Sequence, residues 1–282
     1  MRRHFDTQII ALFFRKNSMA RSFHFRVRKL HRYLGVILGI QFLFWTVGGI
    51  YFSWSNMDEI HGDLNRNPLE MIPVNSEIIS PSLILKQLSE RGEFDSVKEL
   101  KLIAILGKPF YQIHYFPDAA TTTDHSAHAR MKKPAVQLAD AYSGVLRGPL
   151  TESEAVEIAK SAFNGDSKVT EVKMLRETSS HHEYRSNPLP AFAISFDHPS
   201  RTTVFISAEL GTIQKIRNQK WRIFDFLWMM HTMDYEGRDN FGNLLLRIFS
   251  IFGLLTIASG FILFYVSSGV LRRKKKLTGK YN

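Results

Sequence analysis

Histidines are the side chains of this sequence best suited to chemistry, and three of them stand beside long apolar stretches. His231 lies in FLWMMHTMDYEG (226–237), His61 in NMDEIHGD (56–63) and His31 in RVRKLHR (26–32). An imidazole nitrogen among apolar and aromatic side chains can bind the iron of a b-type haem, because those side chains bury the porphyrin. The structural alternative for His31 is an interfacial polar group, and for His231 a core residue bonded to a backbone carbonyl.

The neighbours of His231 strengthen the ligand interpretation. If residues 221–234 are helical, Phe224, Leu227, Trp228 and His231 occupy positions i, i+3, i+4 and i+7 and form one apolar stripe. Asp234 follows three residues later. Its carboxylate is predicted to accept the second ring N–H of His231 and so to set the tautomer.

The positions of the three histidines decide which of them can share a metal. His31 and His231 are expected at opposite ends of membrane spans about 30 Å long, so they cannot bind the same iron. His61 and His231 are expected at the same end and could bind one haem together, with Asp63 or Asp58 orienting His61. His31 would then need a ligand partner from another chain.

A second arrangement of histidines has metal-ligand spacing. His125 and His128 form an H-x-x-H pair beside Asp124 in TTTDHSAHARMKK. The surrounding residues are typical of a flexible hairpin tip, which favours a solvated loop over a metal site. The pair His181 and His182 is interpreted in the same way.

Two uncharged segments must position these residues. Residues 34–54 and a second stretch within 244–268 are each long enough to cross the hydrocarbon core as helices. The alternative, a buried core helix, is disfavoured by their length and by the charged residues that flank them. Gly35 and Gly39 form a G-x-x-x-G pair, which predicts close packing of the spans or of two copies of the chain.

The charge of +11 is distributed unevenly and predicts the topology. Nine Lys and Arg residues and one acid, Asp6, stand in the basic segment 1–33, and six basic residues and no acid stand in 268–282. By the positive-inside rule both ends, 1–33 and 269–282, are cytoplasmic, and the region between the spans is periplasmic in a bacterium. A near-neutral middle argues against nucleic acid as a partner. The first span is expected to be an uncleaved anchor, and Met19 is an alternative start.

The region between the spans repeats one pattern. After a linker (55–79), residues 80–150 and 151–220 each predict a helix, several strands and a glycine hairpin, with Gly144 aligned to Gly211. Thr151 and Glu154 predict a capping box at the second helix. Residues 221–243 form an amphipathic pre-membrane helix and its connector. The expected fold class is therefore α+β, with two transmembrane helices flanking a tandem of helix-plus-antiparallel-sheet modules.

Several kinds of chemistry are excluded by what the sequence lacks. With no cysteine, the chain cannot form disulfides, cysteine-ligated iron–sulfur clusters or the C-x-x-C-H attachment of c-type haem. It has no G-x-S-x-G, P-loop, G-x-G-x-x-G or H-E-x-x-H motif, which disfavours hydrolases and nicotinamide enzymes. Any redox role would therefore need an external electron donor.

The hairpin sequence LADAYSGVL (138–146) resembles the end of a PepSY domain, and FISAELGTI (205–213) matches it loosely, without the aspartate. RKLHRYLGVILGI and RIFDFLWMMHTMDY resemble the PepSY-associated transmembrane family of bacterial membrane proteins. The resemblance covers residues 24–268. It implies either iron-regulated reduction of ferric siderophores through b-type haem, or inhibition or chaperoning of peptidases. This chain has two predicted membrane helices rather than the four of the reductases, so the resemblance does not imply a complete two-haem path within one chain.

Two functions follow as expectations. The first is a bacterial inner-membrane protein associated with iron and siderophore uptake. It would act as a b-haem electron-transfer component with a membrane redox partner, a second copy of itself or a ferric siderophore. If enzymatic, it is one component of a ferric reductase. The second is a non-enzymatic anchored module that docks a periplasmic protein such as a peptidase, with no cofactor.

Overall fold

The computed structural model of the protein describes residues 2–68, 71–73, 76–92, 94–117, 134–165 and 167–268. The chain divides into two compact units. The helical unit comprises Met1–Trp54 and Asp225–Asn282, and the α+β unit comprises Ser55–Phe224. The predicted α+β fold class is confirmed to the extent of two long apolar helices and two antiparallel sheets.

The helical unit is built on two long helices, α1 (Arg2–Trp54) and α6 (Leu244–Ser267). Phe25–Trp54 of α1 and all of α6 are apolar enough and long enough to cross a membrane. At 1.5 Å per residue these segments are about 45 and 36 Å long. The span predicted at residues 34–54 lies within this part of α1, and the residues just before it include the basic Arg26, Arg28 and Lys29. The helix continues back through the basic segment, because residues 2–33 contain no glycine or proline to end it.

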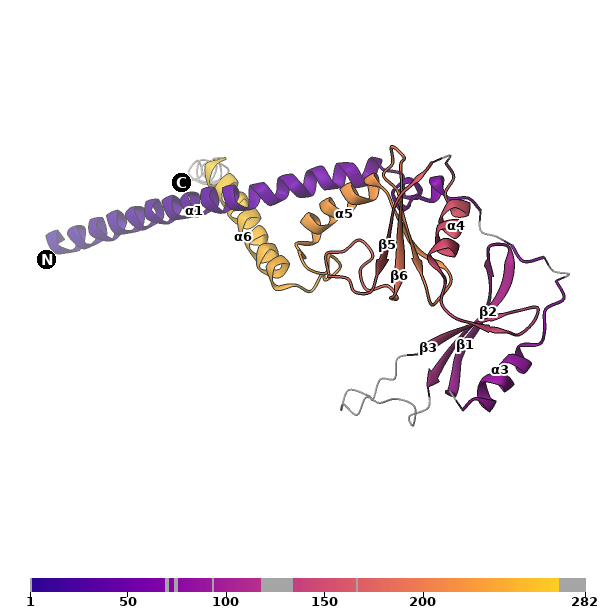
Figure 1. Ribbon diagram of the computed structural model, residues 1–282. Coiled ribbons are helices and arrows are strands. Elements are labelled where there is room, and N and C mark those ends of the chain that lie inside the picture. The colour runs from indigo at the N-terminus through magenta and orange to yellow at the C-terminus, as the bar shows by residue number, and fades with distance from the viewer. Residues whose placement is uncertain are drawn as a thin grey trace. The chain divides into compact units, whose positions relative to one another are not determined.

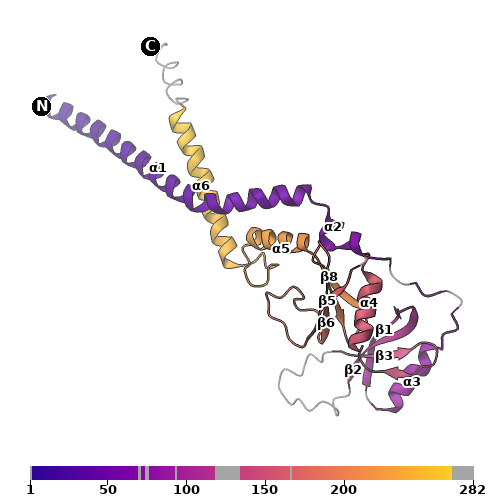
Figure 2. The same ribbon diagram turned by 45° about the horizontal axis from the view of Figure 1, so that its top comes forward.

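The two long helices cross in Figures 1 and 2. They pack through aromatic side chains. Leu38 and Phe249 are buried in the contact. Phe42, Trp45 and Phe249 meet edge to face, with ring centroids 5.5–5.9 Å apart. This is the geometry that aromatic quadrupoles favour, and it adds about 0.5–1.5 kcal/mol per pair beyond burial.

The G-x-x-x-G pair of the first span does not make this contact. A Cβ built on Gly35 or Gly39 would meet no atom within 4 Å, so α6 does not pack on these glycines. The close approach uses glycines of α6 instead. A Cβ on Gly253 would lie 3.8 Å from the Phe42 ring, and one on Gly260 would lie 3.3 Å from Cε1 of His31. Pairing of two copies through Gly35 and Gly39 stays a prediction.

The first module of the α+β unit follows two short helical turns, α2 (Met57–His61) and η1 (Asp63–Asn65). It consists of α3 (Pro81–Glu90) and the antiparallel meander β1 (Phe94–Ile105), β2 (Lys108–Pro117), β3 (Ala135–Asp140) and β4 (Leu146–Arg147). β2 is buried on both faces. Tyr111 and Ile113 contact Ile84 and Leu88 of α3, while Phe110, one position out of phase, joins the core shared with the second module.

The second module repeats the plan. Its elements are α4 (Glu152–Ala162), β5 (Val169–Leu175), β6 (Ala191–Phe196), β7 (Thr203–Ser207) and β8 (Ile213–Arg217), with the strands paired in sequence order. α4 lies against β5 and β6 in Figure 1. The opposite face of this sheet is covered by the loop that carries Tyr184, which is fully buried and stacks on Phe205.

Local signals explain where these elements begin and turn. Thr151 and Glu154 form the predicted capping box, with Glu154 N donating to Thr151 Oγ1 and Thr151 N donating to Glu154 Oε2. Gly144 and Gly211 have φ values of 75° and 69°, as expected for the turns that close each meander. The residues after these glycines form the second strand of each hairpin, β4 and β8.

The two modules share one core. Ile105 and Leu138 of the first sheet pack with Ile194, Val204 and Ile206 of the second. Polar contacts cross the same junction: Gln112 Nε2 donates to the carbonyl of Leu210 at 2.6 Å. The α+β unit is therefore a single body, and its clefts lie between elements that are distant in the sequence.

Candidate functional site

His231 lies near the end of α5 (Gln219–Thr232), where three aromatic rings surround it. Trp228 stacks on it with centroids 6.2 Å apart and planes 11° from parallel. Trp45 and Phe52 of α1 lie 5.5 and 6.1 Å away. Nδ1 of His231 is buried and has no hydrogen-bond partner. A buried nitrogen without a partner costs about 1–3 kcal/mol, which makes this atom the clearest candidate for binding something else.

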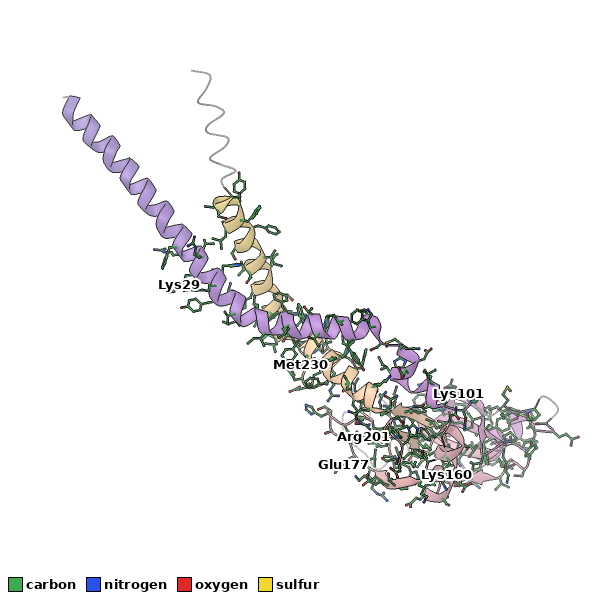
Figure 3. All side chains as sticks on the ribbon, turned by 90° about the horizontal axis from the view of Figure 1, so that it is seen from above. Lys29, Lys101, Lys160, Glu177, Arg201 and Met230 are labelled. Carbon is green, nitrogen blue, oxygen red and sulfur yellow. The ribbon has the colours of Figure 1, made fainter. Side chains whose placement is uncertain are left out.

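Helix periodicity and two backbone anchors build this cage. Trp228 and His231 are three residues apart on α5, and Trp45 and Phe52 are seven apart on α1, so each pair shares a helix face. Trp45 Nε1 donates to the carbonyl oxygen of His231 at 3.0 Å. Gln41, the one strongly polar residue of the predicted first span, donates to the carbonyl of Met230, which Figure 3 labels beside α1.

The predicted role of Asp234 does not match its contacts. Its carboxylate accepts hydrogen bonds from the backbone amides of Asn240, Gly237 and Glu236 at 2.9, 3.2 and 3.4 Å. The amide of Asn240 is the largest cause of its lowered pKa. Asp234 therefore organises the loop between α5 and α6 rather than bonding to Nδ1 of His231.

His31 faces α6, where its Nδ1 lies 2.8 Å from Oγ of Ser259. That hydroxyl also donates to the carbonyl of Thr256 at 2.7 Å. A hydroxyl has one proton, so both bonds can form together only when Nδ1 of His31 is the donor. This tautomer leaves the lone pair on Nε2, the nitrogen then available to a ligand. Gly260 gives the ring its space.

His31 and His231 do not form one site. His231 packs on Trp45, which is 14 residues from His31 along α1, or about 21 Å. The sequence-based conclusion that these two imidazoles cannot share an iron is therefore consistent with the helical unit.

His61 and Asp63 belong to the α+β unit, and both are exposed. Their predicted joint site with His231 would join the two units, so it stays a prediction. His125 and His128 lie outside the described residues. Within the described ranges, no group of three His, Asp or Glu side chains is placed to hold a metal ion.

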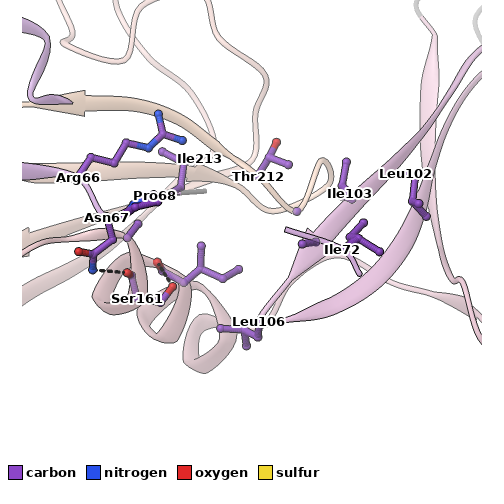
Figure 4. A pocket seen from close by; sticks show the side chains of 14 residues that line it. Arg66, Asn67, Pro68, Ile72, Leu102, Ile103, Leu106, Ser161, Thr212 and Ile213 are labelled. Carbon is purple, nitrogen blue, oxygen red and sulfur yellow. Dashed lines mark hydrogen bonds between the residues drawn. The ribbon is translucent and has the colours of Figure 1, made fainter. Parts of the chain in front are cut away.

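A cavity of about 400 Å³ opens where the two modules of the α+β unit meet (Figure 4). Its apolar lining comes from β1, α4 and β8 and includes Leu102, Ile103, Ile158 and Ile213. The linker forms another wall, held by Asn67, whose amide side chain donates to the carbonyl of Ser161 at 2.7 Å. This cavity was not predictable from sequence patterns, because its walls come from segments as distant as Arg66 and Ile213.

Comparison of the chain with models of known protein families, with curated proteins and with solved structures finds no match in any of the three.

Proposed function

We propose that the protein is a two-pass bacterial inner-membrane protein whose α+β unit binds a ligand or partner in the periplasm, in support of iron uptake. The observation that carries the binding role is the apolar cavity between the two modules. Its volume of about 400 Å³ falls in the range of small-molecule sites. The link to iron uptake is supported by the resemblance of the sequence to PepSY-associated membrane proteins.

The membrane part of the proposal is supported by the apolar surface of the helical unit. Large side chains along both helices are exposed, among them Ile37 at 66%, Leu254 at 69% and Phe261 at 70%. Contiguous apolar surface of this extent is unfavourable in water and is suited to lipid tails. The basic residues before the first helix and after the second then favour cytoplasmic ends.

Reporter fusions test the topology. Alkaline phosphatase fused after residue 150 should be active and a fusion after residue 282 inactive, because the enzyme needs the oxidising periplasm. A cytoplasmic fluorescent reporter should give the opposite pattern. Activity of the phosphatase at residue 282 but not at 150 would overturn the orientation.

Growth under iron limitation tests the binding role. A strain lacking the protein should grow poorly on a ferric siderophore and recover with the wild-type chain. Leu102→Asp places a charge in the cavity wall at a residue 39% exposed, so the fold should tolerate it while recovery is lost. Leu83→Asp, on α3 and 54% exposed, is the matched control outside the cavity. Full recovery with Leu102→Asp would argue against the cavity as the functional site.

The unpartnered nitrogen of His231 favours a second candidate, a b-haem electron-transfer component. Nδ1 would bind the iron, Trp45, Phe52 and Trp228 would bury the porphyrin, and haem would supply one-electron chemistry. His31 would not hold the same group, because it lies too far along α1 from Trp45.

The spectrum of the purified protein decides between the two functions. A Soret band that shifts on reduction with dithionite and disappears in His231→Ala, but persists in His31→Ala, supports haem at His231. A protein that stays colourless after expression with excess haem would rule out the haem function and leave the binding function as the remaining candidate.

A further inference from the structure

A second, smaller cavity of about 310 Å³ lies on the α+β unit along β8. Its polar lining contains the three cations Arg66, Lys215 and Arg217 and the imidazole of His61, against one acid, Asp63. Lys215 and Arg217 are two residues apart on a strand and so share one face. The cavity therefore has a net positive charge even with His61 neutral.

None of these three cations forms a salt bridge with any residue that the structure describes. The acid that acts electrostatically on Arg217 is Glu183, and its carboxylate is already held by Arg222 through two bonds of 2.5 and 2.9 Å. Arg217 instead donates a hydrogen bond from Nε to the backbone carbonyl of Glu183, at 3.3 Å. The positive charge of the cavity is therefore not neutralised by the surrounding protein.

Arg217 is held in place although it lacks a carboxylate partner. It is only 9% exposed, and its guanidinium lies 3.8 Å from the centroid of the Trp221 ring. Arg185 lies over the same ring at 5.7 Å, so a further positive charge is close by. An arginine stacked on an indole presents its planar donors in a fixed direction, which suits recognition of carboxylate or phosphate oxygens.

The electrostatics of the cluster agree with this geometry. Burial, and then the neighbouring Arg185, lower the pKa of Arg217 to about 10. Burial, and then Arg217 and Arg185, lower the pKa of Lys215 as well. Both shifts express the free-energy cost of holding like charges together away from water. An anion placed between the two side chains would offset that cost.

We propose that the cavity formed by His61, Asp63, Arg66, Lys215 and Arg217 binds a small soluble anion that carries carboxylate or phosphate groups. Arg217 and Lys215 would contact the charged oxygens, and Arg66 and His61 would contribute further donors from the rest of the lining. This inference is independent of the proposed function, because it uses neither the apolar cavity nor the membrane helices.

Calorimetric titration of the full chain in nanodiscs of zwitterionic lipid, at low ionic strength, tests the site with citrate and inorganic phosphate as probes. Saturable binding of one anion per chain is expected. Lys215→Gln and Arg217→Gln should each weaken it at least tenfold. Lys173→Gln is the matched control, because Lys173 lies on β5 of the same sheet, is exposed and pairs with Glu171. It should leave the affinity unchanged.

Three results would overturn the proposal: no binding of either probe at millimolar concentration, equal binding by wild type and Lys215→Gln, or an equal loss in Lys173→Gln. Lys215 is half-buried, so its variant keeps the test valid if Arg217→Gln fails to fold. Titration in discs that contain an anionic phospholipid separates the sources of the anion. Unchanged citrate affinity there supports a soluble ligand, whereas displacement of citrate by the lipid refutes it.

Discussion

Replacing Gly211 with alanine tests how the two modules of the α+β unit are joined. Gly211 has φ of 69°, and a Cβ added there would lie 2.7 Å from Cδ1 of Ile105 and 3.3 Å from Cδ1 of Leu138. The left-handed backbone costs alanine about 1–2 kcal/mol. Forcing a methyl group into the shared core costs about 1–3 kcal/mol more. We therefore expect Gly211→Ala to lower the free energy of unfolding by about 2–5 kcal/mol.

Gly107→Ala is the matched control for the packing part of this effect. Gly107 has φ of 74°, but a Cβ there would meet no atom within 4 Å. It should cost only the backbone part, about 1–2 kcal/mol. Hydrogen exchange of β2 and β7 amides in the full chain, measured in detergent, reports both variants. Equal losses would show that the turn at Gly211 does not press on the first module, and would refute the shared core.

Three further predictions concern single contacts. Glu154→Gln should lower the stability of α4 by about 1 kcal/mol at neutral pH. This is less than the whole pKa shift of Glu154 would correspond to, because its ion pair with Arg147 is partly exposed and screened by solvent. The hydrogen bond from Arg147 is the main cause that lowers the pKa of Glu154 to about 2, so this stability is present above pH 4.5 and is lost as the pH falls toward 2. Amide exchange of α4 should differ between wild type and variant at pH 6 and converge near pH 2. A difference that stays constant with pH would contradict this role of the ion pair. Tyr184→Phe should cost about 1 kcal/mol in thermal unfolding, because the hydroxyl of the buried Tyr184 no longer donates to the carbonyl of Pro188 at 2.5 Å; Pro188 is exposed, so water can reach the carbonyl, and no change would show that water replaces the bond fully. His231→Phe should stabilise the helical unit against SDS by about 1 kcal/mol, since it keeps the ring contacts and removes an unpaired nitrogen; destabilisation would mean that the imidazole is there for packing.

Local signals predicted the elements of the α+β unit well. The capping box at Thr151 and the turns at Gly144 and Gly211 depend on residues close in sequence, and all three are confirmed. α5 ends two residues earlier than expected, at Thr232, because Met233 takes φ of 53° and leaves the helix. No periodicity argument detects such a residue, since methionine is a good helix former.

The sites were harder to predict because they depend on contacts between distant segments. The apolar stripe of α5 correctly placed Trp228 beside His231, but Trp45 and Phe52 come from a helix nearly two hundred residues earlier. Gln41 was a usable signal, because a lone amide in an apolar span needs a partner. The cationic cavity had no comparable signal. Arg217 looks like an ordinary strand-end residue until Trp221 and the pairing of Glu183 with Arg222 are known.

The two candidate sites differ in the kind of unpaired group that each contains. In the helical unit, Nδ1 of His231 lacks a hydrogen-bond partner inside an aromatic cage. This costs about 1–3 kcal/mol, which the packing of the surrounding side chains can offset. In the α+β unit whole charges are unpaired, but they line an open cavity where water and ions reach them. A charge buried without such access would shift its pKa until it became neutral. The first site therefore suits a largely apolar group with a metal that can accept the lone pair of one ring nitrogen. The second suits an ion that exchanges with solvent.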